Sequence, residues 1–277
     1  MAFEPRAPLG RYHLGANSLI ARSSPFARAA CLAVLLVPLI VLPVAAAPSD
    51  VAVEHARILA YWTPVRMAAA RPLTISPTVS GGTKGKPVAP AGGTVTGSSW
   101  TNRGPIMKLT GKVFFHMPSG DYICSGSVIT DSRAGNSTVL TAGHCAYDFT
   151  SGFVTNWMFI PNFDANPTYD CASTTYGCWT ATALVIHYGF RYAGAFTEQA
   201  ATHDWAFAVV GAGGKNGAPL DTTVGGSYGI TLNASSSRLE AFGYPAGAPY
   251  TGSDLTWCAG PATVDLSSAT GTTWRMK

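Results

Sequence analysis

Charged side chains are scarce in this sequence. Asp, Glu, Lys and Arg make up only 12% of the 277 residues, whereas apolar residues make up 47%. The formal net charge is +4, but residues 1–47 carry four arginines against one glutamate, which leaves only +1 for everything that follows. Without a basic patch or stripe, a nucleic acid is a poor candidate partner. The apolar fraction is enough for the core of one large domain or two small ones.

Several signatures of other protein classes are also missing. The sequence has no internal repeat, no nucleotide-binding glycine loop and no CxxC or HxxxH spacing of the kind that zinc sites use. Gly (30) and Pro (19) are frequent, with abundant Thr and Ser, and this composition favours strands and turns over long helices. We therefore expect a β-rich protein that uses no metal and no cofactor.

The amino-terminal region looks like an export signal. Four arginines precede an apolar run at residues 29–44, and Val44-Ala45-Ala46-Ala47 offers small residues to a signal peptidase. We place cleavage after Ala46, so that residues 1–46 form a signal peptide and the mature protein is secreted. Because the apolar run is near the length of a membrane span, a membrane-anchored protein is the alternative. Pro38 and Pro43 within the run favour the signal peptide.

Export changes the expected state of the cysteines, because cysteines outside the cytoplasm pair as disulfides rather than persist as thiols. Removal of the signal peptide takes Cys31 away. Five cysteines then remain: Cys124, Cys145, Cys171, Cys178 and Cys258. The odd number leaves one of them without a partner, and their pairing is not fixed by the sequence alone.

Two segments of different character follow the signal. Apolar residues recur at roughly helical spacing in residues 49–72, namely Val51, Ile58, Leu59, Trp62 and Val65. Pro64 is expected to kink this helix or to end it at Thr63. Residues 76–99 are rich in Pro, Gly, Ser and Thr, which predicts a flexible linker. A helix between a signal and a linker is most simply a propeptide, at residues 47–75; the alternative is a helix that packs on the domain.

Residues 100–277 are predicted to be all-β. Met117-Pro118-Ser119-Gly120 is a favourable hairpin turn between two apolar segments. Regularly spaced short strands with turn residues between them favour a sandwich or a barrel. The segments that predict strands are residues 112–116, 122–130, 137–141, 157–160, 181–187, 204–210 and 238–242.

Three stretches of this region resemble the trypsin/chymotrypsin-like serine peptidases: CSGSVI (124–129), VLTAGHC (139–145) and HDWAFAVV (203–210). The resemblance is to the secreted bacterial branch that includes glutamyl endopeptidases, and AYWTPVRMAAARPL (60–73) and GYPAGAPYTG (243–252) add to it. It implies a two-barrel chymotrypsin-like architecture. It also implies a secreted, monomeric endopeptidase that acts on proteins or peptides and has no stable membrane association once the signal is removed.

The resemblance implies catalytic roles for His144 and Asp204. A serine hydroxyl is a weak nucleophile at neutral pH, so a positioned imidazole must take its proton. A buried carboxylate then fixes the tautomer of the imidazole and stabilises the imidazolium that forms. The family's chain order is His, then Asp, then Ser, and His144 followed by Asp204 fits the first two places.

His144 and Asp204 also have alternative interpretations. His144 could be a core or turn histidine, or a zinc ligand together with Cys145. Asp204 could be an ordinary carboxylate at the start of a strand. Three other aspartates rival it, namely Asp170, Asp221 and Asp254, but none leads into an alternating apolar strand. The remaining histidines of interest are predicted to be structural or surface residues: His116, His187 and His203.

The resemblance also suggests how two of the cysteines pair, and a short loop suggests a second pair. Cys124 and Cys145 fit the family's disulfide that ties the CSG strand to the histidine turn, where it restrains the base and limits the unfolded chain. Cys171 and Cys178 enclose ASTTYG and are expected to close a short surface loop.

The nucleophile of the family is missing from the sequence. Its serine stands in a GxSGG-like segment, and none of the serines after Asp204 does: Ser227, Ser235, Ser236, Ser237, Ser253, Ser267 and Ser268. Gly225-Gly226-Ser227 is followed by Tyr228 and is predicted to be a turn. Cys258 supports the same interpretation, because related proteins carry a cysteine just before the active serine. We therefore expect residues 100–277 to be a peptidase domain that lacks its serine segment.

Two expectations follow from the missing segment. The second barrel should be incomplete, and this chain by itself should be inactive, although His144 and Asp204 are retained. A non-catalytic secreted binding protein on the same fold is the alternative function.

Overall fold

The computed structural model describes residues 49–73, 75, 94–132, 134–231, 237–264 and 274–276. Every described residue belongs to one unit, Ala47–Lys277. The predicted signal peptide (1–46) and residues 76–93 of the predicted linker lie outside the described residues.

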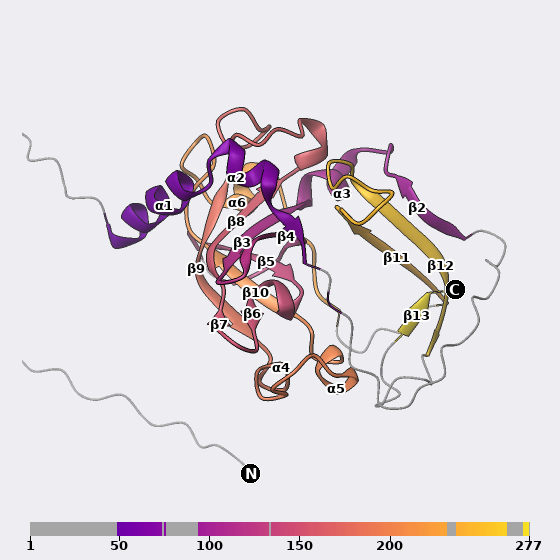
Figure 1. Ribbon diagram of the computed structural model, residues 1–277. Helices are drawn as coiled ribbons and strands as arrows, with labels where there is room; N and C mark the ends of the chain where they lie inside the picture. The colour runs from indigo at the N-terminus through magenta and orange to yellow at the C-terminus, as the bar shows by residue number, and fades with distance from the viewer. Residues whose placement is uncertain are drawn as a thin grey trace, which may run out of the picture. The chain divides into compact units, whose positions relative to one another are not determined.

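Six antiparallel strands close into a barrel (Figure 1). They hydrogen-bond in the order β4-β3-β8-β9-β10-β5, and β5 returns to pair with β4. Their bounds are β3 Thr110–Met117, β4 Gly120–Ile129, β5 Ser137–Thr141, β8 Thr155–Pro161, β9 Trp179–Ile186 and β10 Ala206–Val210. The six strands predicted for this part of the sequence are therefore confirmed, with ends that differ by no more than two residues.

Local sequence explains the β3–β4 hairpin. Met117 pairs with Gly120, so Pro118 and Ser119 form the turn that the sequence predicts. The backbone of Gly120 has φ 138°, which L side chains rarely adopt, so glycine is required there. Alternation then directs the side chains, because residues on one face of β5 and of β10 are buried in a strict period of two.

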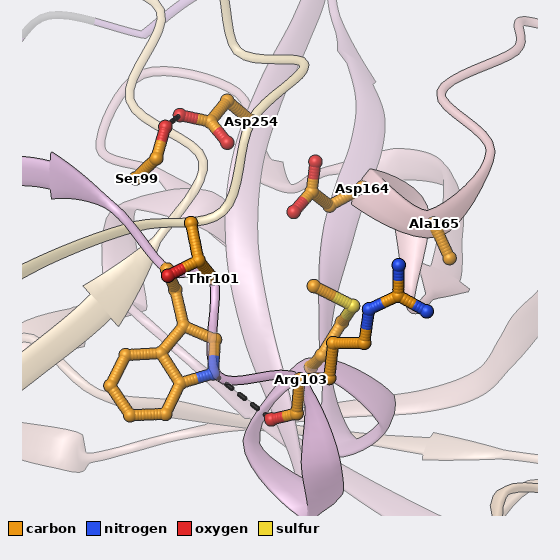
Figure 2. A pocket seen from close by; sticks show the side chains of 8 residues that line it. Ser99, Thr101, Arg103, Asp164, Ala165 and Asp254 are labelled. Atoms are coloured by element: carbon orange, nitrogen blue, oxygen red, sulfur yellow. Dashed lines mark hydrogen bonds between the residues drawn. The ribbon is translucent and has the colours of Figure 1, made fainter.

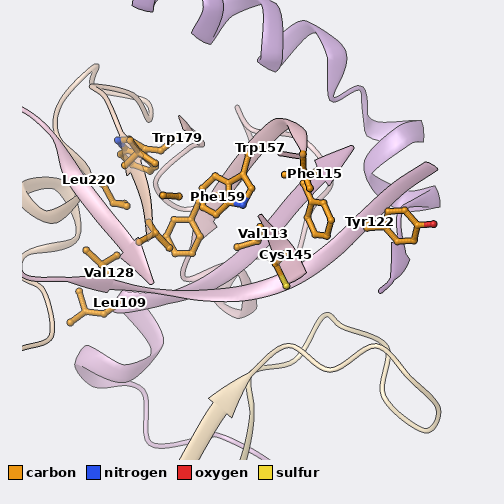
Figure 3. Close-up of a cluster of buried hydrophobic side chains, with 14 of the residues drawn as sticks. Leu109, Val113, Phe115, Tyr122, Val128, Cys145, Trp157, Phe159, Trp179 and Leu220 are labelled. Atoms are coloured by element: carbon orange, nitrogen blue, oxygen red, sulfur yellow. The ribbon is translucent and has the colours of Figure 1, made fainter. Parts of the chain in front are cut away.

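The barrel interior is filled by large apolar side chains (Figure 3). Trp157, Phe159 and Trp179 are at most 2% exposed and lie in one cluster with Val113 and Phe115. Burial of a large apolar side chain contributes about 1.5–3 kcal/mol to stability relative to an exposed position. This core holds the strands that carry the candidate site.

A second, four-stranded sheet does not close among the described residues. Strand β12 (Thr256–Val264) pairs with β11 (Arg238–Gly243), with β13 (Trp274–Met276) and with β2 (Val95–Ser99). The strand predicted at 238–242 is confirmed as β11. Residues 95–99, predicted to belong to the linker, instead form β2. Short polar strands such as this one carry little sequence signal, and it is the backbone of β12 that pairs with them.

Two helices precede the barrel. Helix α1 (Asp50–Tyr61) and helix α2 (Pro64–Ala69) are separated where Pro64 predicts a break. The Ser49 and Thr63 hydroxyls accept hydrogen bonds from amides in the first turns of α1 and α2, respectively. Such caps satisfy amides that would otherwise lack partners.

Both helices pack on the barrel rather than standing apart from it. Helix α1 contacts β8 and β9, and α2 contacts β4 (Figure 1). Ile58, Trp62 and Met67 are at most 3% exposed, and the Trp62 indole donates to the Asn156 carbonyl at 2.6 Å. The alternative that these residues pack on the domain is thus observed, and their removal as a propeptide stays a prediction.

The remaining elements are short. None of the helices in the described ranges is long and apolar enough to span a membrane. The short elements are β1 Arg71–Pro72, α3 Gly104–Leu109, the 3-10 turns η1 Gly143–Cys145 and η2 Phe163–Ala165, β6 Tyr147–Asp148, β7 Gly152–Phe153, α4 Tyr188–Arg191, α5 Glu198–Ala201 and α6 Leu220–Val224.

Candidate active site

His144 lies at the end of strand β5, in the 3-10 turn η1. The strand pairs with β10 so that Thr141 is opposite Ala206, in antiparallel register. Two residues beyond this pair, the chain on one side has reached Gly143 and on the other Asp204. The register of two strands, set by the buried face of each, thus brings together residues that are 60 positions apart in sequence.

Two hydrogen bonds join His144 to Asp204. The backbone amide of His144 donates to Asp204 Oδ1 at 2.8 Å, and the ring atom Nδ1 lies 2.7 Å from Asp204 Oδ2. The His144 and Asp204 side chains are 22% and 15% exposed, respectively. An ionised carboxylate only accepts hydrogen bonds, so beside it a neutral imidazole carries its proton on Nδ1 and its lone pair on Nε2. Nε2 is therefore free to act as a proton acceptor.

Gly143 leaves the space that this pair needs. A Cβ atom at position 143 would lie 3.1 Å from Asp204 Oδ1 and 3.2 Å from the ring of Phe190. Few real Cβ atoms have contacts this close, so any larger residue would displace the carboxylate or the ring. The glycine of TAGHC therefore has a packing reason that the sequence analysis did not identify.

A disulfide bond restrains the histidine turn from the other side. Cys145, which is 2% exposed, is bonded to Cys124 of β4. His144 is thus held between a covalent link from its neighbour Cys145 to β4 and hydrogen bonds to Asp204, two residues before β10. The second disulfide joins Cys171 and Cys178 across a short loop. The Cys124–Cys145 bond has the pairing that the family resemblance implies, and the Cys171–Cys178 bond closes the short loop that the sequence suggests.

The zinc alternative is disfavoured by the same disulfide. Potential ligand atoms of His144, Cys124 and Cys145 lie within 4.8 Å of one another, a spacing that could hold a metal ion. Zinc, however, binds cysteine as thiolate, and both sulfurs here are committed to the disulfide bond.

The rival aspartates pair elsewhere. Asp170 accepts hydrogen bonds from Ser173 and Ala172, Asp221 from Ser137, and Asp254 from Ser99. Among the rival histidines, His187 and His203 stack on each other with ring centres 4.2 Å apart. His116 lies 2.8 Å from Asp121 and forms a second His–Asp pair, at the β3–β4 hairpin.

No serine hydroxyl in the described part of the chain hydrogen-bonds to the His144 ring. Ser227 bonds to Thr130, and the helix before it ends at Gly225 with φ 81°, so this stretch is the turn that the sequence predicts. Ser253 lies in the loop before β12, where its amide donates to Thr251. Ser237 directly precedes β11, and its carbonyl accepts a hydrogen bond from the Ala262 amide. The other late serines lie outside the described residues: Ser235, Ser236, Ser267 and Ser268.

Cys258 is a free thiol on β12 with intermediate exposure. It is the odd cysteine that the sequence predicts.

A cavity of about 240 Å³ opens beside His144. Phe196 forms part of its wall and meets the His144 ring edge to face, with ring centres 6.0 Å apart. Sequence reasoning missed Phe196, because a single phenylalanine in the loop before α5 carries no pattern. Its neighbour Phe190, in α4, continues the apolar contact with a ring-centre distance of 6.2 Å.

A separate cavity of about 410 Å³ has two carboxylates (Figure 2). Asp164 and Asp254 both face it, beside Ser99 and Arg103. Burial, followed by the charge of Asp254, raises the pKa of Asp164, and the backbone amide of Leu255 offsets this only in part. No residue predicted to be catalytic lines this cavity, so the candidate active site is the His144–Asp204 pair.

Comparison with known proteins finds similarity to solved structures of proteases. No protein-family model matches the sequence, and neither does any curated protein. Among solved structures, the chain is similar to protease Anisep from Arthrobacter nicotinovorans, with 34% identity and a TM-score of 0.51, covering 65% of this chain and 73% of that one. It is also similar to a thermostable serine protease, AL20, from an extremophilic microorganism, with 31% identity and a TM-score of 0.49, covering 63% and 81%.

Proposed function

Because the chain belongs to the trypsin/chymotrypsin-like serine proteases, we propose that it is a secreted endopeptidase in which His144 is the general base and Asp204 orients it. The observation that supports this proposal is the pair of hydrogen bonds from His144 to one carboxylate, with Nε2 left as the acceptor. Its substrates are proteins or peptides. The two disulfides support an extracellular site of action.

The chemistry of this pair is proton transfer. Nε2 of His144 takes the proton of a serine hydroxyl as the oxygen attacks a peptide carbonyl, and later returns it to the leaving amine. Asp204 holds the imidazole in the correct tautomer and stabilises the imidazolium, as in the established chymotrypsin-like triad. The disulfide at Cys145 and the β5–β10 register keep the base in place, which lowers the reorganisation needed in the transition state.

The nucleophile is the part that residues 1–277 do not supply. None of their serines stands in a GxSGG-like segment. We therefore expect this polypeptide by itself to form no acyl-enzyme and to have no peptidase activity.

The test combines an assay with a reactive probe. Purified polypeptide of residues 1–277 should neither hydrolyse labelled casein nor react with a fluorophosphonate, which modifies activated serines. Inhibitor-sensitive hydrolysis by this polypeptide would contradict the proposed absence of the nucleophile.

The reading frame past the codon for Lys277 provides the complementary test. If it encodes a GxSGG-like segment, the polypeptide that includes this segment should hydrolyse casein and lose that activity in His144→Ala. An active His144→Ala variant would remove the proposed role of His144. If no such segment exists, a binding function on the same fold becomes the better account.

A further inference from the structure

One edge of β4 is covered by a segment that precedes the barrel. Strand β4 pairs with β3 over Gly120–Ser127, but with β5 only over Ser127–Ile129. The other edge of its first half is taken by β1, which pairs in parallel with Tyr122 and Ile123. We call Arg71, Pro72, Leu73 and Ile75 the covering segment.

Arg71 fastens the start of the covering segment to the β3–β4 hairpin. Its guanidinium donates to the Ser119 carbonyl at 3.2 Å and to the Tyr122 hydroxyl at 3.4 Å. It also lies 5.4 Å from the centre of the Tyr122 ring. These contacts fix the segment on β4, directly before the cysteine that is bonded to the histidine turn.

The end of the covering segment reaches the candidate active site. Leu73 and Ile75 line the cavity of about 240 Å³ that His144 also lines. Leu73 in addition packs against the barrel core. The apolar part of the cavity wall comes from Met117, Phe149 and Phe196. Two branched aliphatic side chains of the chain itself are therefore in place beside the proposed catalytic base.

An exposed strand edge is a general peptide-binding surface. It binds the main chain of an extended peptide by hydrogen bonds, and neighbouring pockets select the side chains. The first half of β4 offers such an edge once β1 is removed, because the described part of the chain places no other strand there. The cavity beside it has an apolar wall suited to an aliphatic side chain.

We propose that the β4 edge at Tyr122 and Ile123, together with the cavity beside His144, is a subsite for an extended peptide with a branched aliphatic side chain. In the present chain the covering segment takes the β4 edge and forms part of the cavity wall, and so blocks the subsite. An intramolecular occupant acts at an effective concentration of about millimolar, which a free peptide of modest affinity does not overcome. That the natural peptide is a substrate rests on the proposed function.

Peptide binding to an opened variant tests the proposal without any need for a nucleophile. The probe is a fluorescein-labelled peptide with the sequence of residues 70–76, Ala-Arg-Pro-Leu-Thr-Ile-Ser. The opened variant is Leu73→Ser/Ile75→Ser, purified with both disulfides formed. We expect its Kd for the probe, measured by fluorescence anisotropy, to be lower than that of the unmodified chain by about tenfold or more.

Matched controls separate binding at the subsite from non-specific binding of the probe. Val65→Ser removes a branched aliphatic residue that is 78% exposed on α2, and it should bind the probe no better than the unmodified chain. Phe196→Ala in the opened variant should cancel most of the gain. A probe with Ser in place of Leu and Ile should bind the opened variant at least about tenfold more weakly.

Folding of the opened variant is checked by circular dichroism. Should the double substitution prevent folding because Leu73 touches the core, Ile75→Ser alone carries the same comparison. A folded opened variant that binds the probe no more tightly than the unmodified chain overturns the proposal. So does a gain that persists in Phe196→Ala.

The outcomes also separate this inference from the proposed function. One outcome is that the opened variant binds the probe in a way that requires Phe196, while neither the polypeptide of residues 1–277 nor a longer form shows serine-dependent hydrolysis. That result supports the subsite and removes the peptidase function. Hydrolysis by an extended form whose opened variant gains no binding supports the function and overturns the subsite.

Discussion

Asp204 is the residue on which the orientation and the tautomer of His144 depend. It accepts one hydrogen bond from the His144 backbone and one from the ring, so it fixes both the turn and the tautomer. A hydrogen bond to an ionised acceptor is shorter and about twice as strong as one between neutral groups. Loss of the charge at this position should therefore affect the ring more than loss of an ordinary contact.

The first prediction concerns the ring proton of His144. Because it is donated to a carboxylate at 2.7 Å, the Nδ1 proton should give a low-field resonance in a proton NMR spectrum, and Asp204→Asn should shift it upfield or abolish it. His116 forms the other His–Asp pair, at 2.8 Å from Asp121, so His116→Gln serves as the assignment control. A low-field resonance that survives in Asp204→Asn and is lost in His116→Gln would contradict the assignment.

The second prediction concerns Asp164. Burial and the charge of Asp254 raise its pKa above 3.8, so the folded protein binds more protons than the unfolded chain as pH rises through this region. The free energy of unfolding therefore falls across that window and stays lower at neutral pH. Asp164→Asn should raise the free energy of unfolding at pH 7, and the gain should vanish below the unfolded pKa.

Urea unfolding of the unmodified chain and of Asp164→Asn at pH 3 and pH 7 measures this difference. Asp254→Asn relieves the same repulsion, so the gains of the two substitutions should not add. A destabilised Asp164→Asn at neutral pH would mean that the bond from the Leu255 amide outweighs the charge.

At the scale of elements, the two disulfides close loops of different length. Cys124–Cys145 links β4 to η1 across 21 positions, whereas Cys171–Cys178 spans only 7. In the chain-entropy account, a longer closed loop restricts the unfolded chain more. The bond beside His144 should thus contribute more to stability than the loop bond.

The third prediction compares the two bonds directly. Replacing both cysteines by serine should lower the free energy of unfolding by about 3 kcal/mol for Cys124/Cys145 and by about 2 kcal/mol for Cys171/Cys178. Denaturant unfolding of the two double variants measures both values. The Cys171/Cys178 variant should also keep the low-field His144 resonance. Equal losses of stability would show that chain entropy does not govern these bonds.

The helical segment before the barrel is fixed by a polar cluster as well as by apolar burial. The Tyr61 hydroxyl donates to Asp121 at 2.6 Å, and Arg66 forms an ion pair with the same carboxylate at 3.0 Å. Burial and the neighbouring Asp121 raise the pKa of Tyr61 to about 12, so the hydroxyl keeps its proton at neutral pH. These contacts place β1 and the covering segment at the edge of β4.

At the scale of the whole molecule, Lys112 connects the barrel to the second sheet. It lies on β3, is 1% exposed, and its ammonium donates to the Gly252 carbonyl at 2.9 Å, in the loop between β11 and β12. The ring of Phe163 lies 4.8 Å away. A cation so enclosed loses its hydration, and burial lowers the pKa of Lys112 to about 8.

The fourth prediction is the pH dependence that Lys112 contributes to stability. Between pH 8 and 10.5 the unfolded chain binds a proton that the folded protein has lost, so the free energy of unfolding should rise with pH in that window. The slope is at most about 1.4 kcal/mol per pH unit. In Lys112→Met this rise should be absent.

Subtracting the unfolding curves of the two proteins removes the contributions of other groups. Equal slopes in both proteins between pH 8 and 10.5 would contradict the burial of a titrating ammonium at this position.

The sequence by itself determined the parts of this protein that depend on neighbouring residues. Short apolar segments between turn residues predicted the barrel strands. Pro118 and Gly120 predicted the hairpin turn, and Pro64 the break between the helices. The family resemblance carried by the motifs around His144 and Asp204 implied which two residues meet. Each of these signals acts over a few residues, because side-chain periodicity and turn chemistry are set by the local backbone.

Only the tertiary structure decided what lies against these elements. The residues that line the cavity at His144 come from four separate stretches, and Leu73, Ile75 and Phe196 carry no pattern that marks them. Lys112 reads as an ordinary charged residue in a strand, and residues 95–99 read as a linker. The burial of Lys112 and the strand at residues 95–99 both depend on contacts with distant parts of the chain. Such contacts rest on packing and backbone hydrogen bonds that no short stretch of sequence specifies.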